Sequence, residues 1–169
     1  MRNFWVAFVV LLSIAGGVLF GDMGSKVDER AVKSAQLAQF KDLSGNWRRL
    51  SDWDGSYRIV NFWATWCTPC LKEIPAFVKF YKENSEYVEI LGLDFEPVNI
   101  EVINDFIERF NINYPIVLYD HRNDSEYSNF GEILGMPTTQ IFSPEGELLQ
   151  TFMGEVTIED LNKFIKPIT

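Results

Sequence analysis

A near-continuous apolar run leads directly into the only two cysteines of this chain. Residues 58–64 spell Arg-Ile-Val-Asn-Phe-Trp-Ala, which is typical of a strand buried on both faces of a parallel sheet. Cys67 and Cys70 follow, and residues 69–84 then place apolar side chains at helical spacing. A Cys-x-x-Cys pair where a buried strand passes into a helix is the arrangement that thiol–disulfide chemistry requires. This segment therefore predicts a layered sheet with a redox site at one edge.

Strands and helices alternate along the rest of the chain. After a short strand or hairpin within 40–53, strands are expected at 87–95, 115–119, 138–142 and 148–153, and helices at 98–110, 125–134 and 157–166. Pro75 lacks an N–H and is expected to kink the helix at 69–84. Thr157 is the expected N-cap of the last helix, with Asp160 at the capping-box position. This order predicts an α/β fold with a central mixed β-sheet and helices on both faces.

Other roles for a Cys-x-x-Cys pair can be weighed against this sequence. A structural zinc site needs four ligands, usually Cys or His, and this chain has two cysteines and one histidine, His121. A c-type haem site needs His directly after the second cysteine, where this chain has Leu71. A structural disulfide is the remaining alternative, but so short a loop adds little stability. A redox pair is the preferred interpretation, with no metal and no cofactor.

The two cysteines are expected to differ in environment. Cys67 should lie at the N-terminus of the helix, where unpaired N–H groups and the helix dipole favour the thiolate that attacks a disulfide. Cys70 should lie deeper and resolve the mixed disulfide that Cys67 forms. Pro69 fits the first helical turn, where its missing N–H costs little. Trp66 is expected to shield Cys67 and contact partners, with core packing as the alternative, whereas Trp63 is expected in the core.

The charge balance restricts the partners of this protein. The net charge is −9 and the sequence pI is about 4.6. Nucleic-acid binding needs clustered Lys and Arg to neutralise phosphates, and attraction to an anionic membrane surface also needs a basic patch. We therefore expect no nucleic-acid partner, whereas a positively charged protein surface is compatible with this charge.

The N-terminal part of the chain is expected to lie outside the globular domain. Residues 4–20 form an apolar run, which favours an uncleaved signal-anchor over a cleaved signal peptide within residues 1–21. Arg2 precedes this run and Asp22 follows it, so the positive-inside rule places the body of the protein outside the cytoplasm. Residues 22–39 are expected to be a polar tether, partly helical around 27–37, and residues 40–169 the folded domain.

The residues around the cysteines resemble one known family. Residues 61–75, Asn-Phe-Trp-Ala-Thr-Trp-Cys-Thr-Pro-Cys-Leu-Lys-Glu-Ile-Pro, are similar to the active-site segment of the TlpA/ResA-like branch of the thioredoxin superfamily. Residues 135–139, Gly-Met-Pro-Thr-Thr, resemble the family's cis-proline segment, and Gly154 before the last helix also fits. The resemblance extends from Phe40 to the C-terminus. It implies a thioredoxin-like fold and an exported, often membrane-tethered thiol–disulfide oxidoreductase.

The resemblance also implies which residues contact the substrate. The Met136–Pro137 peptide bond is expected to be cis, although few X–Pro bonds are. In the family this loop packs beside the cysteines and offers backbone groups to a bound substrate strand, a form of β-strand addition. Trp66, Thr68 and Pro69 complete the expected substrate contacts. An ordinary loop proline is the alternative interpretation of Pro137.

Glu73 is a candidate catalytic residue. It lies three residues after Cys70 and shares a helix face with it. The matching glutamate of ResA-like proteins lies near the cysteines, which implies that Glu73 accepts the Cys70 proton during resolution. A solvated acid favoured by the helix dipole is the alternative. Thioredoxin has a buried Asp at the position of Asn61. Asn61 therefore departs from thioredoxin and agrees with the TlpA/ResA branch, and this raises the importance of Glu73.

Two further acids, Asp94 and Glu96, lie at the carboxyl end of the strand expected at 87–95. Open α/β folds place their sites at this edge, so a role in substrate choice is one interpretation. A solvated strand end is the preferred one. His121 is expected in a loop and is assigned no role.

The expected activity is reduction of disulfides in exported proteins, with apocytochrome c before haem attachment as one candidate substrate. Electrons would come from a membrane thiol-transfer protein, and the chain would be anchored by residues 4–20 in the bacterial cell envelope with its catalytic domain on the periplasmic side. One alternative is a disulfide oxidase or isomerase, because thioredoxin-like sites span a wide range of potentials. Another is a copper-carrying or docking module, because two cysteines can bind Cu(I).

Overall fold

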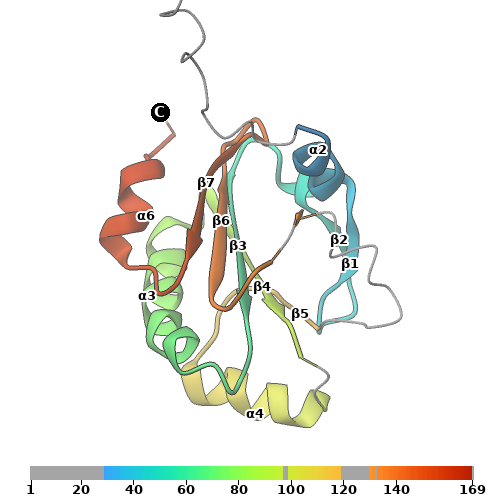
Figure 1. Cartoon of the computed structure of the whole chain (residues 1–169), viewed down its shortest axis with the longest axis vertical. Helices are drawn as coiled ribbons and strands as arrows, with labels where there is room; N and C mark the ends of the chain where they lie inside the picture. Colours follow the sequence, from blue (N-terminus) through green and yellow to red (C-terminus); the bar gives the residue numbers. More distant parts are fainter. Residues whose placement is uncertain (1–28, 97–98, 119–129, 132, 169) are drawn as a thin grey trace, which may run out of the picture.

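The computed structural model describes residues 29–96, 99–118, 130–131 and 133–168 (Figure 1). Within these ranges no helix has both the length and the apolar character needed to cross a membrane. The hydrophobic helix expected at residues 4–20 lies outside the described residues, as does most of the helix expected at 125–134. The loop residue His121 also lies outside them.

The main sheet has five strands. Their order across the sheet is β5 (Ile116–Leu118), β4 (Val88–Asp94), β3 (Tyr57–Trp63), β6 (Thr138–Phe142) and β7 (Leu148–Met153). Strands β3, β4 and β5 are parallel, whereas β6 is antiparallel to both β3 and β7. Strand β3 is central and buried along nearly its whole length, as its apolar run predicts, and the edge strand β7 alternates between half-buried and exposed residues. The expected mixed sheet is confirmed.

Three helices cover one face of this sheet. They are α3 (Thr68–Asn84), α4 (Ile100–Phe110) and α6 (Ile158–Phe164), and their apolar sides share one core with β3 and β4. Helix α3 begins at the cysteines, and Pro75 lies inside it as expected. Trp63, at the end of β3, is 1% exposed and stacks on Phe106 of α4 with ring centroids 4.9 Å apart. Trp63 is therefore a core residue, as predicted.

The other face carries a helix, a strand pair and a 3-10 turn, which lie opposite α3 and α6 (Figure 1). These are α2 (Glu29–Leu37), the antiparallel pair β1 (Gln39–Lys41) and β2 (Trp47–Arg49), and η1 (Leu50–Trp53). Ala35 and Phe40 are buried in a second core with Phe62 of β3. Residues 29–37 therefore belong to the folded body, a correction to the polar tether expected over 22–39. Ala35 and the neighbouring Val32 give α2 an apolar side that packs against this core.

A buried arginine joins this second layer to the sheet. Arg58 of β3 is 1% exposed, and its guanidinium donates five hydrogen bonds of 2.7–3.2 Å. The acceptors are side-chain oxygens of Gln36 and Asp54 and the carbonyl oxygens of Leu50, Ser143 and Pro144. Burial lowers the pKa of Arg58 from its ordinary value, and Asp54 opposes this change. Arg58 thus fastens α2, η1 and the turn between β6 and β7 to the central strand.

The last helix begins as the sequence predicts. Thr157 is the N-cap of α6, and its Oγ1 accepts the backbone N–H of Asp160 at 3.2 Å. The Asp160 carboxylate accepts the backbone N–H of Thr157 at 3.2 Å in return, which completes the capping box. The start of α6 lies beside α3, because the two helices pack together on the same face.

Candidate active site

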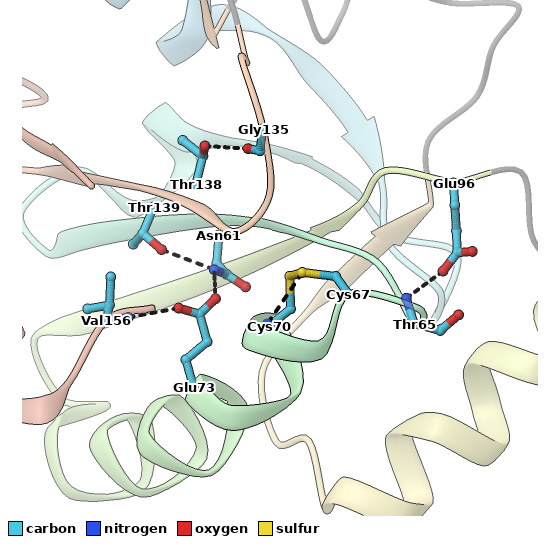
Figure 2. The surroundings of a disulfide bond; sticks show 10 residues. All are labelled: Asn61, Thr65, Cys67, Cys70, Glu73, Glu96, Gly135, Thr138, Thr139 and Val156. Carbon is cyan, nitrogen blue, oxygen red and sulfur yellow. Dashed lines mark hydrogen bonds between the residues drawn. A yellow bond between two sulfur atoms is a disulfide. The ribbon is translucent and has the colours of Figure 1, made fainter. Parts of the chain in front are cut away.

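The two cysteines form a disulfide at the start of α3 (Figure 2). Cys67 is the N-cap of the helix, and its Sγ accepts the backbone N–H of Cys70 at 3.3 Å. The Cα atoms of the two residues are 5.3 Å apart. A sulfur at this position faces the free N–H groups of the first helical turn, which stabilise a thiolate when the disulfide is reduced. The predicted placement of Cys67 at the helix N-terminus is confirmed.

The residues around the disulfide differ in exposure as the expected roles require. Cys70 is completely buried and Cys67 is 4% exposed, so Cys70 is the deeper of the two. Thr68 and Pro69, between them, are exposed, and Trp66 is 65% exposed. An indole that projects into solvent next to a redox centre does not pack in the core. Trp66, Thr68 and Pro69 thus form the solvent-facing surface of the site.

Glu73 is buried behind the disulfide, one turn further along α3. Its side chain is 1% exposed, and both carboxylate oxygens accept hydrogen bonds, from Asn61 Nδ2 at 2.7 Å and from the backbone N–H of Val156 at 3.0 Å. Burial raises the pKa of Glu73 from 4.5 to about 7, although the two hydrogen bonds oppose this change. The solvated-acid interpretation is therefore wrong. The pKa of Glu73 is suited to accepting and releasing a proton near neutral pH.

Asn61 connects Glu73 to the sheet. This side chain is fully buried on β3, and its Nδ2 donates both to Glu73 and to Thr139 Oγ1, the latter at 3.0 Å. Its Oδ1 has no hydrogen-bond donor among the described residues. The amide therefore fixes the position of the Glu73 carboxyl relative to β3 and β6 (Figure 2).

The proline segment takes the predicted form. The Met136–Pro137 peptide bond is cis, and Met136 packs against the core cluster that contains both cysteines. The loop is held by two hydrogen bonds, from Thr138 Oγ1 to the carbonyl oxygen of Gly135 at 2.7 Å and from the N–H of Gly154 to the carbonyl oxygen of Pro137 at 2.9 Å. The structure thus packs this segment, from a separate part of the sequence, against the core that contains the disulfide.

A second pair of acids lies on the other side of the site, where the sequence predicted a solvated strand end. For Asp94 this prediction is wrong, because its side chain is fully buried at the end of β4. Burial, together with the neighbouring Glu96, raises the pKa of Asp94 from 3.8 to about 8. Glu96 is half-buried, and its Oε1 accepts the backbone N–H of Thr65 at 2.5 Å. The one sequence signal for this pair is its position at the carboxyl end of a buried strand.

The described residues contain no group of three or more His, Cys, Asp and Glu side chains arranged to hold a metal ion. What the site offers is a dithiol or disulfide at a helix N-terminus, a buried carboxyl group able to exchange a proton, and a cis-proline loop that packs against the same core. On a sheet of this topology these features define a thiol–disulfide oxidoreductase of the thioredoxin superfamily. The reacting atoms are the Sγ atoms of Cys67 and Cys70.

Comparison with known proteins identifies the family. Residues 30–151 match the family model described as AhpC/TSA family. A thiol-disulfide oxidoreductase ResA from Bacillus cereus is 31% identical over 166 residues, which cover 95% of this chain and 94% of the relative. A ResA from Bacillus subtilis is 34% identical over 131 residues, which cover 75% of this chain and 71% of the relative. The chain belongs to the AhpC/TSA family and, within it, to the TlpA/ResA-like branch of the thioredoxin superfamily.

Solved structures agree with this assignment. The crystal structure of StoA from Bacillus subtilis is similar with a TM-score of 0.60 and 31% identity, covering 74% of this chain and 92% of that chain. The thioredoxin domain of a thiol-disulfide oxidoreductase from Bacteroides vulgatus is similar with a TM-score of 0.67 and 25% identity, covering 76% and 92%. The expected thioredoxin-like fold and the oxidoreductase activity are confirmed.

Proposed function

We propose that this protein is a reductase that donates electrons to disulfides in exported proteins. Residues 4–20 anchor it in the bacterial cell envelope with the catalytic domain outside the cytoplasm, and a membrane thiol-transfer protein returns it to the dithiol state. Apocytochrome c before haem attachment is one candidate substrate. A relative of this chain is named thiol-disulfide oxidoreductase ResA, and the solved structure of StoA is similar to this one. The name of the first supports the class of reaction.

The burial of Glu73 is the main observation that supports reduction, as opposed to oxidation, of the substrate. A thioredoxin-like site becomes oxidising when its reduced form is stabilised, usually because the attacking thiolate is stabilised. Here a carboxyl group lies behind Cys70 on the same helix, and its pKa is raised to about 7 by burial. When this group is ionised, it disfavours a nearby thiolate and therefore opposes the stabilisation of Cys67 by the helix N-terminus. This balance favours a protein that gives up electrons.

The proposed reaction moves two electrons from the protein to its substrate. The Cys67 thiolate attacks one sulfur of the substrate disulfide, forms a mixed disulfide and releases the other substrate sulfur as a thiolate, which takes up a proton. Cys70 then loses its proton to Glu73, and the Cys70 thiolate attacks Cys67 Sγ. The bond between Cys67 and the substrate breaks, and the second substrate sulfur leaves as a thiolate that takes the proton. The substrate ends as a dithiol and the protein as the Cys67–Cys70 disulfide seen here.

The reduction potential of the Cys67–Cys70 pair tests this direction. We expect equilibration of the full chain with dithiothreitol and glutathione buffers to place the potential below about −200 mV, in the range of thioredoxin and glutaredoxin. A value near −120 mV, that of a strong disulfide oxidant, would contradict the proposal and favour the oxidase alternative. An insulin-reduction assay with Cys67→Ser as control separates catalysis from binding, because a copper-carrying or docking module would reduce insulin no faster than this variant.

The substrate can be identified by trapping. Cys70→Ser leaves Cys67 able to attack but removes the resolving thiol, so mixed disulfides should accumulate. Expressed with its N-terminal segment, the variant should capture exported proteins that contain cysteines, and Cys67→Ser should capture none. Capture of cytoplasmic proteins alone would contradict the proposed location.

A further inference from the structure

The acids Asp94 and Glu96 are not used in the reaction described above. Figure 2 places Glu96 on the Cys67 side of the disulfide, opposite Glu73. Its carboxylate is 2.5 Å from the backbone nitrogen of Thr65, which comes two residues before Cys67. Thr65 lies two residues after the end of β3 and begins the short segment 65–67 that carries the exposed Trp66 and the attacking sulfur. Glu96 therefore holds the segment that positions Cys67 at the start of α3.

Asp94 lies behind Glu96 and needs a proton to be stable there. Both of its carboxyl oxygens are buried and have no hydrogen-bond donor among the described residues, so an ionised Asp94 would be an uncompensated buried charge. A proton on Asp94 removes this charge and supplies an O–H that can donate to the neighbouring Glu96 carboxylate. The pKa of Asp94 is raised to about 8, first by burial and then by Glu96, which agrees with a proton held there at neutral pH.

The described residues around Asp94 add no second charge to that of Glu96. Its sheet neighbours are Trp63 on β3 and Leu118 on β5, which do not titrate in the neutral range. Among the described residues of all the elements packed around it, Glu96 is the one whose charge influences the pKa of Asp94. A proton on Asp94 therefore leaves the Glu96 carboxylate as the charged member of the pair.

We propose that Asp94 and Glu96 are positioning residues for Cys67: they share one proton, hold the Thr65 N–H, and keep one negative charge beside segment 65–67. This charge opposes the helix N-terminus and makes the Cys67 thiol less acidic than the helix alone would. The pair acts on the attacking thiol from the Cys67 side of the disulfide, whereas Glu73 lies behind Cys70 and accepts its proton.

The pH profile of Cys67 reactivity tests this role. Full-length protein in detergent with Cys70→Ser has Cys67 as its single thiol, and its alkylation by iodoacetamide follows the thiolate fraction. Glu96→Gln keeps an oxygen that can accept the Thr65 N–H but removes the charge. We expect the midpoint of the profile to fall by about half to one pH unit, the size expected for a charge on the order of 10 Å away at an effective dielectric of about 20–40. Glu101→Gln, at an exposed position on α4, should leave the midpoint unchanged.

Two results would overturn the proposal. If Glu96 only held the backbone, Glu96→Gln would give the same midpoint as the parent protein, because its amide oxygen keeps the hydrogen bond. The shared proton has an independent test that needs no variant. The carbon-13 shift of the Asp94 carboxyl should titrate near pH 8, and a midpoint near the ordinary 3.8 would show that no proton is shared. Neither measurement depends on whether the protein acts as a reductase or an oxidase.

Discussion

The buried carboxyl of Glu73 should make the folding stability of the oxidised protein depend on pH. Its pKa is about 7 in the folded protein and 4.5 in an unfolded chain, because burial disfavours the ionised form. The folded state therefore binds this proton more tightly than the unfolded state does. The resulting stability is complete below pH 4.5 and is lost as the pH rises through 7.

The size of this effect follows from the two pKa values. A pKa difference of one corresponds to 1.36 kcal/mol, so the difference between 4.5 and about 7 corresponds to about 3 kcal/mol in the free energy of unfolding. Glu73→Gln removes the titration and keeps the size of the side chain. The amide oxygen can still accept from Asn61, but its NH₂ group meets the N–H of Val156, so we also expect a constant loss of stability at every pH. Asp94 is present in both proteins, and its contribution cancels in the comparison.

Urea denaturation of the oxidised protein and of Glu73→Gln, at intervals from pH 4 to pH 8, measures this difference. The free energy of unfolding of the parent minus that of the variant should fall by about 3 kcal/mol over this range. The same comparison with Glu147→Gln, at an exposed position, should give a difference that does not change with pH. If the Glu73 difference stays constant within about 0.5 kcal/mol, the argument that burial raises its pKa is wrong.

Three further substitutions test the packing around the site, each by denaturant unfolding. Arg58→Met should lower the free energy of unfolding by about 3–5 kcal/mol, because it leaves buried carbonyl oxygens without a donor. A loss below about 1 kcal/mol would contradict the conclusion that Arg58 holds the second layer to β3. Gly92→Ala should cost about 1–3 kcal/mol, since a Cβ there would lie 2.5 Å from Cδ1 of Ile116, and a neutral result would mean that the Ile116 side chain moves aside freely. Thr157→Ala removes the N-cap of α6 and should cost about 1 kcal/mol, whereas Thr157→Ser should restore most of the loss.

The order of elements and the placement of the cysteines could be predicted from the sequence because both depend on local patterns. The apolar run of β3, the helical spacing of α3 and the capping pair of α6 are each contained in a short stretch of chain. The burial of Glu73 depends instead on Val156, which is 83 residues away, and the sequence left it undecided between a catalytic and a solvated acid. The packing of α2 and the burial of Asp94 also result from contacts between distant segments, so single-sequence patterns did not identify them.

The acids around the disulfide bear on the proposed direction of electron transfer. The helix N-terminus stabilises a Cys67 thiolate and so shifts the potential towards the oxidising end of the range. Glu73 and Glu96 lie on opposite sides of the disulfide (Figure 2). Glu73 is buried and Glu96 is half-buried, and salt screens a buried charge less than an exposed one. They share no hydrogen-bond partner among those the structure describes, since Glu73 binds Asn61 and Val156 and Glu96 binds Thr65. Because the two groups act through separate contacts, their effects on the reduction potential should be nearly additive.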